Sequence, residues 1–153
     1  MNRVLVLVAV LLAACGDSGE PMKGDVVVTY GGSSPKMDVG TAVQDEETPG
    51  KMLVQFGTDE VDCDSYLDVF LDFNLPEGTF VYFSVDKMAG TYASASVSAM
   101  KNTSRSTSIN STTGMVTITA VEPRVTGTVT FTTTDEEVGV ISATGSFDVK
   151  RCF

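Results

Sequence analysis

Apolar and polar residues alternate along much of this chain, most clearly in residues 66–73 and again in residues 79–85. A period of two is typical of a β-strand with one buried face. Residues 74–78 include Asn, Pro and Gly and have the composition of a tight turn between the two stretches. Folding about this turn brings the apolar positions to one face. We therefore predict a β-hairpin with Phe70 opposite Tyr82 on its other face.

The same alternation predicts a three-stranded antiparallel meander near the end of the sequence. Residues 116–120 and 125–129 form its first hairpin, with Val116 opposite Val129. A third strand returns over residues 138–149 after a turn centred on a glutamate, and threonines at alternate positions from 126 to 134 line the solvent face. The register predicted for the last two strands folds about Glu136 and pairs Phe131 with Ile141, Val129 with Ala143, Gly127 with Gly145, and Val125 with Phe147.

Further strands are predicted at residues 25–30, 37–43, 51–56 and 91–97. Residues 102–113 are so rich in Ser, Thr and Asn that we expect an exposed loop there, with one ragged edge strand as the alternative. The chain has no long stretch of helical period, and short strands at this spacing are typical of two-layer β folds. The predicted fold class is all-β, an antiparallel β-sandwich of seven to nine strands, immunoglobulin-like or jelly-roll-like.

The first residues have a different pattern, that of an export signal. One basic residue, Arg3, precedes an unbroken apolar run over residues 4–12, and Ala13, Ala14 and Cys15 follow. A helix over this run would cross only about half of a hydrocarbon core about 30 Å thick. The run is therefore too short to serve as a transmembrane anchor.

Leu12-Ala13-Ala14-Cys15 resembles the lipobox of bacterial lipoproteins. The resemblance implies that the Cys15 thiol takes a diacylglycerol, that residues 1–14 are removed, and that the freed amine is acylated. The membrane is then a partner through the lipid, and acyl chains contribute about 0.8 kcal/mol per buried methylene. The alternative is an ordinary signal peptide, cleaved near Ala14, with the cysteine incidental.

Three regions follow from these patterns. Residues 1–14 are the signal peptide, residues 15–24 are the lipidated cysteine and a flexible tether, and residues 25–153 are the β domain. In Gram-negative lipoproteins, an aspartate directly after the lipidated cysteine commonly retains the protein at the inner membrane. Gly16 stands at that place here. The resemblance therefore implies the outer membrane of the cell envelope, with the periplasmic and surface sides both open.

Residues 125–129 and 145–152 look like the closing strands of short bacterial β-sandwich lipoproteins of uncharacterised function. The likeness rests on a G-[ST]-F-x-V-x-x-C pattern that runs from Gly145 to Cys152. It supports the fold class and implies no activity.

The charge balance excludes some partners. The chain has 10 basic and 20 acidic residues, a formal net charge of −10 at pH 7. Loss of Arg3 with the signal peptide leaves 9 − 20 = −11. A surface with this balance repels nucleic acid and anionic lipid headgroups, and we expect neither as a partner.

Two cysteines, Cys63 and Cys152, remain once Cys15 is assigned to the lipid. In the oxidising compartment that an export signal implies, we expect a disulfide between them, with two free thiols as the alternative. The sequence has no histidine, which excludes Ser-His and Cys-His catalytic pairs and His-ligated metals, and we expect no cofactor. Ser84 and Lys87 have the S-x-x-K spacing of Ser-Lys acyl-transfer enzymes, but that motif needs a helix and here a strand ends at Ser84.

Carboxylates cluster at three places along the chain. Residues 45–47 and 135–137 are interpreted as solvated turns. The third cluster surrounds Cys63 and lacks the loop pattern of EF-hand sites, so a charged loop is its simplest interpretation. Its oxygens make it a weak calcium candidate through Asp59, Glu60, Asp62 and Asp64.

The outer face of the first predicted hairpin is the best candidate for a ligand. There Phe70 stands opposite Tyr82, flanked by Asp68 and Asp72. Aromatic rings beside carboxylates hold sugars on many β modules, and exposed aromatics also mark protein interfaces. A pair that only stabilises the hairpin, or that a loop covers, is the alternative.

These features favour a lipid-anchored cell-envelope protein with a non-catalytic binding or structural role. A carbohydrate- or peptidoglycan-binding module that uses the Phe70 and Tyr82 face is the first alternative, so an envelope glycan or protein is the expected partner. A hydrolase that uses the carboxylates of Asp68 and Asp72 is the alternative from another class.

Overall fold

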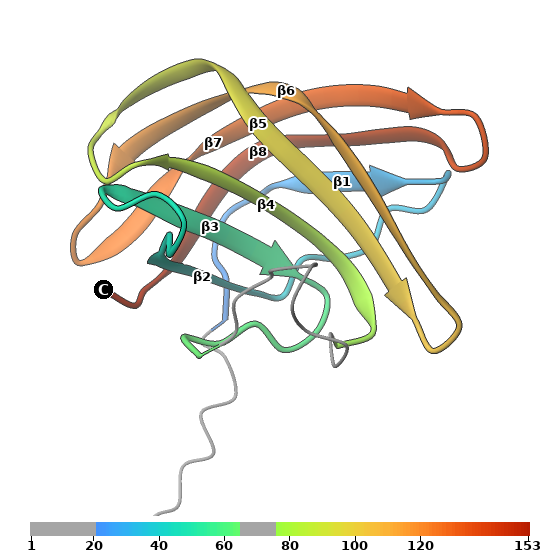
Figure 1. Cartoon of the computed structure of the whole chain (residues 1–153), viewed down its shortest axis with the longest axis horizontal. Coiled ribbons are helices and arrows are strands. Elements are labelled where there is room, and N and C mark those ends of the chain that lie inside the picture. Colours follow the sequence, from blue (N-terminus) through green and yellow to red (C-terminus); the bar gives the residue numbers. More distant parts are fainter. Residues whose placement is uncertain (1–20, 65–75) are drawn as a thin grey trace, which may run out of the picture.

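The computed structural model describes residues 21–64 and 76–153, and the regular structure in these residues is all β-strand (Figure 1). None of the described residues forms a helix that could traverse a lipid bilayer. The all-β, sandwich-like class predicted from the sequence is confirmed. The strands are β1 (Val27–Tyr30), β2 (Val39–Gln44), β3 (Lys51–Gly57), β4 (Gly78–Asp86), β5 (Gly90–Thr103), β6 (Ser106–Ala120), β7 (Arg124–Asp135) and β8 (Gly139–Arg151).

These eight strands form one sheet that closes on itself. Neighbours in the sheet follow chain order from β2 to β8, and β8 pairs with β7 on one edge and with β1 and β2 on the other. The short contact that sets Thr41 opposite Lys150 is parallel, so the sheet is mixed rather than wholly antiparallel. The meander order also differs from the predicted immunoglobulin-like and jelly-roll-like orders, because those need two sheets joined by crossing connections.

The core lies inside the closed sheet, where alternate side chains of every strand meet. Phe56 of β3, Phe83 of β4 and Phe147 of β8 are buried at its centre, with ring centroids 6.4, 6.1 and 5.7 Å apart. Gly127 of β7 pairs with Phe147, and a Cβ atom there would lie only 2.8 Å from the ring. The three rings therefore pack strands β3, β4 and β8 together across the core. Gly127 has no side chain, and the Phe147 ring occupies the space beside it.

The first hairpin of the predicted C-terminal meander is present as β6 and β7. Val116 pairs with Val129, as predicted from the alternation. A bulge after Ile118 then moves Ala120 opposite Thr126, one residue away from the predicted partner. Irregularities of this kind insert a residue without changing the overall alternation, so the sequence does not reveal them.

The β7–β8 hairpin has the predicted strands but a different register. Phe131 pairs with Ala143 rather than with Ile141, a shift of two residues. The turn is centred one residue later than predicted, because the carboxylate of Asp135 accepts hydrogen bonds of 2.9 Å from two backbone N–H groups of the turn and Gly139 takes a φ of 89°. A shift by an even number leaves the same side chains facing the core.

Residues 102–113 form strand rather than the predicted loop. β5 and β6 pair as far as a two-residue turn that follows Thr103. The buried Tyr30 of β1 supports this arm, since its hydroxyl donates to Ser108 Oγ at 3.0 Å and accepts from Asn110 Nδ2 at 3.2 Å. Threonine is a strong strand former, and backbone pairing needs no buried face. The hydroxyl-rich composition was therefore a poor indicator of a loop.

Residues 21–23 are already hydrogen-bonded to the sheet. The Met22 N–H donates to the Asp38 carbonyl at 2.9 Å, and Lys23 exchanges backbone hydrogen bonds of 2.9 and 2.7 Å with Asp148. These residues belong to the folded domain rather than to the predicted tether.

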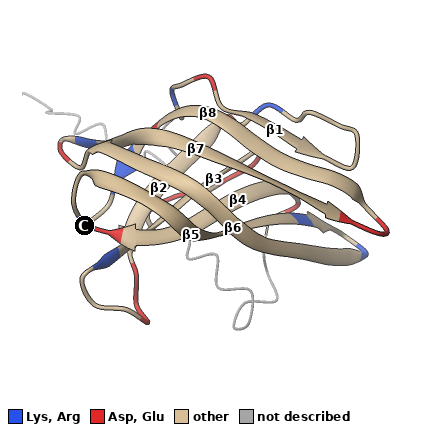
Figure 2. Cartoon of the chain, turned by 90° about the horizontal axis from the view of Figure 1, so that it is seen from above, with Lys and Arg blue, Asp and Glu red and all other residues tan. Residues whose placement is uncertain are grey.

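Charged residues gather at the turns and strand ends, as Figure 2 shows. β6 carries no charged residue, and β7 carries charge only at its two ends. The exposed side chains along the middle of these strands are mostly Thr and Ser. Concentrated charge is therefore found at the ends of the closed sheet, and the candidate site lies at one of them.

Candidate functional site

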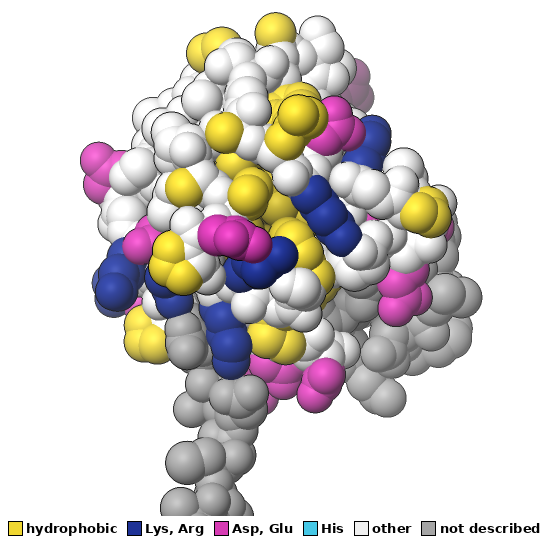
Figure 3. Space-filling model, turned by 90° about the vertical axis from the view of Figure 1, so that its left-hand side faces the viewer, with side chains coloured by type: hydrophobic (Ala, Val, Ile, Leu, Met, Phe, Trp, Pro, Cys, Tyr) yellow, Lys and Arg dark blue, Asp and Glu magenta, His cyan; other side chains and the backbone are white. Residues whose placement is uncertain are grey.

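The β2–β3 turn, the end of β4 and the start of β5 line an open cleft of about 600 Å³, named here the β4–β5 cleft. The three segments meet at the left of Figure 1, and Figure 3 views that end, where hydrophobic side chains show between charged ones. The buried side chains of Val85 and Ala95 reach the cleft from the core side, and Asp86, Ser94 and Lys51 are among the polar residues that line it.

The cleft exists because β4 and β5 diverge. Their last paired residues are Phe83 and Val97, although β4 continues to Asp86 and β5 begins at Gly90. β5 also carries a register shift against β6 after Tyr92. A bulge bends its strand and increases the local twist. The sheet is therefore open at this point, between two strands that are otherwise paired.

The alternation of the ladder shows which backbone groups face the cleft. The Lys87 N–H donates to the Gly50 carbonyl at 3.2 Å, on the β3 side. Successive residues of a strand point their backbone groups to opposite edges, so those of Ser84 and Asp86 point away from β3. The Tyr92 hydroxyl of β5 donates to the Asp86 carbonyl at 3.3 Å, which agrees with this assignment. The backbone groups of Ser84 thus point toward β5, directly after the last pair of the β4–β5 ladder.

Asp45 is the most buried charged group of the cleft, with 5% of the residue exposed. Its carboxylate accepts hydrogen bonds from the Ser84 hydroxyl and from the N–H groups of Glu47 at 3.0 Å and Thr48 at 2.9 Å. Burial raises the pKa of Asp45, but these hydrogen bonds and the nearby Lys51 outweigh it, so the pKa lies below its ordinary value. Asp45 is therefore an ionised, structural carboxylate, and the predicted solvated turn at residues 45–47 is corrected for this residue.

Tyr92 closes one side of the cleft. Its single hydroxyl hydrogen is shared between the Met88 carbonyl at 3.0 Å and the Asp86 carbonyl at 3.3 Å. Burial and the nearby Asp86 carboxylate both raise the pKa of the Tyr92 phenol. The hydroxyl therefore stays protonated at neutral pH and acts as a donor toward the β4–β5 turn.

The cleft combines hydroxyl groups with an excess of negative charge. Asp45, Glu47 and Asp86 line it together with a single cation, Lys51. Ser84 does not form the acyl-transfer pair with Lys87 that their spacing suggests. The Ser84 hydroxyl donates to Asp45, whereas the Lys87 ammonium donates to the side chain of Gln44 and lies 4.5 Å from the ring centre of Phe153. Ser84 and Lys87 are therefore not arranged for nucleophilic attack, and the cleft offers hydrogen-bonding groups instead.

A smaller hollow of about 390 Å³ lies beside the tip of the β5–β6 arm. Tyr30, Lys101 and Ser108 are among its lining residues. The Tyr30 hydroxyl is already bonded to Ser108 and Asn110. We assign this hollow to the support of the arm.

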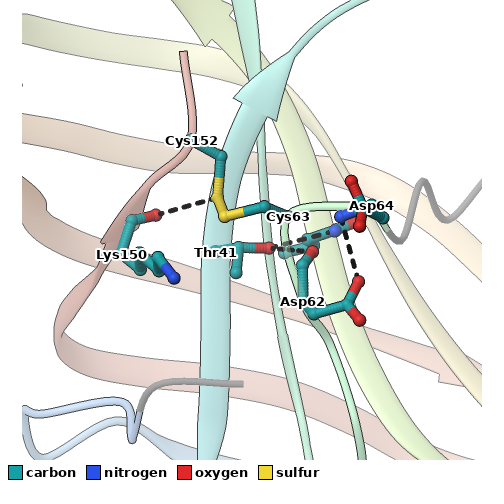
Figure 4. Close-up of a disulfide and its surroundings, with 7 residues drawn as sticks. Thr41, Asp62, Cys63, Asp64, Lys150 and Cys152 are labelled. Atoms are coloured by element: carbon teal, nitrogen blue, oxygen red, sulfur yellow. Dashed lines mark hydrogen bonds between the residues drawn. A yellow bond between two sulfur atoms is a disulfide. The ribbon is translucent and has the colours of Figure 1, made fainter. Parts of the chain in front are cut away.

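The predicted disulfide between Cys63 and Cys152 is present and joins residues 89 positions apart (Figure 4). Beside it, the Thr41 hydroxyl donates to the Asp62 carbonyl at 3.2 Å, and the Cys152 N–H donates to the Ala42 carbonyl at 2.9 Å. The segment that follows β3 and the end of β8 are therefore both fastened to β2.

Tyr82 is the one member of the predicted aromatic face that lies in the described residues. Tyr82 pairs with Gln55 of β3 on one side and with Ser98 of β5 on the other, so neither edge of β4 is left at this position for the predicted hairpin strand. Phe80 and Val61 pack with the partly buried Tyr82 in a small cluster on the outer face of the sheet. Tyr82 thus lies in a packed surface, on a strand that is paired on both sides. The predicted residues Asp68, Phe70 and Asp72 lie outside the described residues, as does Cys15.

The weak calcium candidate is not assembled. Within residues 21–64 and 76–153, no group of three or more acidic or cysteine side chains is placed to hold a metal ion. Asp59 accepts a hydrogen bond from the N–H of Glu60 at 2.9 Å, and Asp62 accepts one from the N–H of Asp64 at 3.0 Å. Short loops favour such local caps, which direct the carboxylates to their own backbone instead of to a common centre.

Comparison of the chain with protein-family models, curated proteins and solved structures finds no match. The candidate site therefore rests on geometry alone. Sequence reasoning missed the cleft, because Asp86, Tyr92 and Ser94 share no motif and come together only where two strands diverge. Only the structural role of Asp45 could have been predicted in part, since an aspartate at the start of a turn commonly accepts hydrogen bonds from the backbone N–H groups of that turn.

Proposed function

We propose that this chain is a lipid-anchored protein of the bacterial cell envelope that binds a partner without catalysis. The lipid is attached at Cys15, and the closed β domain carries the binding site. The observation that supports binding is the β4–β5 cleft, an opening of about 600 Å³ lined by hydroxyl groups and carboxylates.

The anchor part of the proposal rests on the order of basic residue, apolar run and Leu12-Ala13-Ala14-Cys15. Because residues 21–23 are bonded to the sheet, only residues 16–20 separate the lipidated cysteine from the domain. Five extended residues span roughly 17 Å. The domain is therefore held close to the membrane that carries the lipid, and a partner of this protein is a molecule of the envelope.

The binding part rests on rigidity and local chemistry. A closed sheet with a disulfide and a central aromatic cluster is a rigid support for a site. Clefts with a few convergent polar groups are the usual binding sites of proteins. Ser84 is already bonded to Asp45 and is separated from Lys87, which favours recognition over acyl transfer.

Metabolic labelling with an alkyne analogue of palmitate tests the anchor. The full-length wild-type chain should incorporate the label and sediment with membranes, and Cys15→Ala should lose both properties. Ser18→Ala is the matched control in the tether and should behave like wild type. Gly16→Asp should keep the label and move the protein from the outer to the inner membrane fraction. Labelling of Cys15→Ala at the wild-type level would overturn the proposal.

A further inference from the structure

We propose that the hollow beside the tip of the β5–β6 arm binds a carboxylate carried on a short apolar chain. The hollow and the β4–β5 cleft lie at opposite ends of β5, at the lower right and the left of Figure 1. The site is therefore separate from the one in the proposed function. Two groups on paired strands hold the carboxylate: the Lys101 ammonium and the Ser108 hydroxyl.

The inward-facing residues of β5 change from apolar to polar at this end of the closed sheet. Ala95, Val97 and Ala99 belong to the core. Alternate residues of a strand share a face, so Lys101 is the next residue of β5 on the same face. It lines the hollow together with the buried Tyr30 of β1. The mouth of a closed sheet is a common place for a ligand site, and here a cation stands in it.

Lys101 and Ser108 lie side by side in the hollow. They are direct partners in the β5–β6 ladder, and both line the hollow. Residues directly opposite each other in an antiparallel pair share a face and have Cβ atoms about 4.5–5.5 Å apart. An ammonium and a hydroxyl at this separation can donate hydrogen bonds to the two oxygens of one carboxylate.

The Ser108 hydroxyl has a hydrogen left to donate. Its oxygen accepts a hydrogen bond from the Tyr30 hydroxyl at 3.0 Å and a longer one from Asn110 Nδ2 at 3.5 Å. A serine hydroxyl has two acceptor sites and one hydrogen, so only the hydrogen remains. Within residues 21–64 and 76–153, no group accepts it.

The same hydrogen bonds strengthen this donor. Asn110 Nδ2 donates to the Tyr30 hydroxyl at 3.2 Å, and that hydroxyl donates to Ser108 Oγ. Hydrogen bonds in such a chain polarise one another, which makes the last hydroxyl a better donor. The contacts that support the arm therefore also prepare Ser108 to bind an acceptor beside Lys101.

The Lys101 ammonium lacks a counter-charge in the described part of the chain. The ion pairs found there involve Lys36, Arg124 and Arg151. No acid is among the described residues that line the hollow. The nearest acidic turn, at residues 135–137, does not line it either, and the Asp135 carboxylate bonds to the backbone of that turn. An anionic ligand can therefore take the place beside Lys101.

The ligand that fits is a monocarboxylate. One lysine balances one negative charge, whereas a phosphate dianion leaves an excess of negative charge in a chain of net charge −10. Val138 and the Tyr30 ring supply an apolar wall, and the hollow of about 390 Å³ has room for a chain of a few carbons. A free short-chain acid and the C-terminus of a peptide both present this chemistry.

Nuclear magnetic resonance titration of the chain from residue 15 onward, made soluble by Cys15→Ser, tests the proposal with hexanoate. We expect the amide signals of Lys101, Ser108 and Val138 to shift and those of Ser84 and Asp86 in the β4–β5 cleft to stay. Hexanamide has the same length without the charge and should not bind. Inorganic phosphate should bind more weakly than hexanoate.

The source of the carboxylate is identified by a second probe, acetyl-Gly-Val with a free C-terminus. Tighter binding of this dipeptide than of hexanoate supports the proposal with a peptide end as the ligand. Weaker binding supports it with a free acid as the ligand.

Three variants of the protein sharpen the test. Lys101→Met keeps most of the side-chain length and should weaken hexanoate binding at least tenfold. Ser108→Ala should weaken it about tenfold, the equivalent of one hydrogen bond to a charged group. Lys23→Met removes an exposed lysine that pairs with Asp148 near the other end of β8, and it should leave binding unchanged. Circular dichroism spectra confirm that each variant is folded.

Several results would overturn the inference. Equal binding of hexanoate and hexanamide, or equal binding by wild type and Lys101→Met, would show that the lysine does not hold a carboxylate. Tighter binding of phosphate would contradict the monocarboxylate. Absence of binding by both carboxylates at millimolar concentration, or shifts confined to the β4–β5 cleft, would remove the site. None of these results bears on the Cys15 anchor, which the labelling experiment tests separately.

Discussion

The Ser84 hydroxyl donates a hydrogen bond to the Asp45 carboxylate and so joins the end of β4 to the β2–β3 turn. Two backbone N–H groups of that turn bond to the same carboxylate. One buried acid therefore organises the turn and positions the strand that borders the cleft. This arrangement leads to a prediction about the dependence of stability on pH.

The free energy of unfolding should fall as the pH drops below about 4. The folded-state pKa of Asp45 is lowered, so its stabilising contribution is complete above the unfolded-state pKa of about 3.9 and is lost as the pH falls through the folded-state value. Urea denaturation of wild type and Asp45→Asn between pH 7 and pH 3 measures this. The variant should be less stable at pH 7 by about 1–3 kcal/mol and should lose less stability on acidification.

Asp25 serves as the internal comparison for this experiment. Hydrogen bonds from Ser146 lower the pKa of its exposed carboxyl, so part of the acid dependence should persist in Asp45→Asn. A variant whose stability depends on pH as steeply as that of wild type would show that Asp45 is not stabilised in its ionised form.

Removal of the disulfide should destabilise the domain strongly. Cys63 and Cys152 close a loop with a sequence separation of 89, and opening a loop of this size is expected to cost about 2–5 kcal/mol. Urea denaturation measures the loss in the free energy of unfolding. Three samples are compared: Cys152→Ser, oxidised wild type, and wild type with a reducing agent. Reduced wild type and the variant should agree. Equal midpoints in all three samples would argue against the disulfide as a support of the fold.

The aromatic cluster should be the most sensitive part of the core. Phe147→Ala removes a buried ring that contacts both Phe56 and Phe83 and is expected to cost about 3–5 kcal/mol. Gly127→Ala should also destabilise, because the new methyl group would lie 2.1 Å from the Thr117 carbonyl oxygen and 2.8 Å from the Phe147 ring. Thermal unfolding of both variants checks this. An unfolding temperature of Gly127→Ala equal to that of wild type would show that the Phe147 ring does not lie this close to the backbone at residue 127.

The β5–β6 arm should loosen when the Tyr30 hydroxyl is removed. Tyr30→Phe deletes its bonds to Ser108 and Asn110 while keeping the buried ring, so global stability should fall by only about 1 kcal/mol. Hydrogen exchange should accelerate in the arm, at residues 104–112, and remain unchanged in β3. Acceleration spread evenly over all strands would mean that the hydroxyl supports the whole fold instead.

The hydrophobic pattern predicted those elements whose partners are adjacent in the chain. Val116 and Val129 pair as expected, because a short turn leaves few alternatives to the β6–β7 hairpin. At the β7–β8 hairpin the pattern predicted which side chains face the core. The register was decided by the hydrogen bonds of the Asp135 carboxylate to the backbone of the turn. The cysteine pair was predictable because the export signal implied an oxidising compartment and two thiols remained.

The pattern failed where partners are distant in the chain. Alternation of apolar and polar residues indicates which side chains of a strand share a face. It does not indicate which other strand pairs with that strand in the sheet. Residues 79–85 had an adjacent alternating neighbour in the sequence, yet β4 pairs with β3 and β5. The loop predicted for residues 102–113 is wrong for a different reason. Their partners are adjacent in the long β5–β6 hairpin, but the strand has no buried face here and so shows no apolar alternation.

The sequence by itself determined the all-β class, the alternation of side chains that builds the core, and the pairing of Cys63 with Cys152. Each of these depends on residue type and local period. Only the tertiary structure decided that the sheet closes through β8, that β4 and β5 diverge after Phe83, and that Asp45, Asp86 and Tyr92 line one cleft. These relationships depend on the twist of the sheet, on a bulge and on contacts between distant strands. Such features follow from packing in three dimensions and leave no periodic signal in the chain.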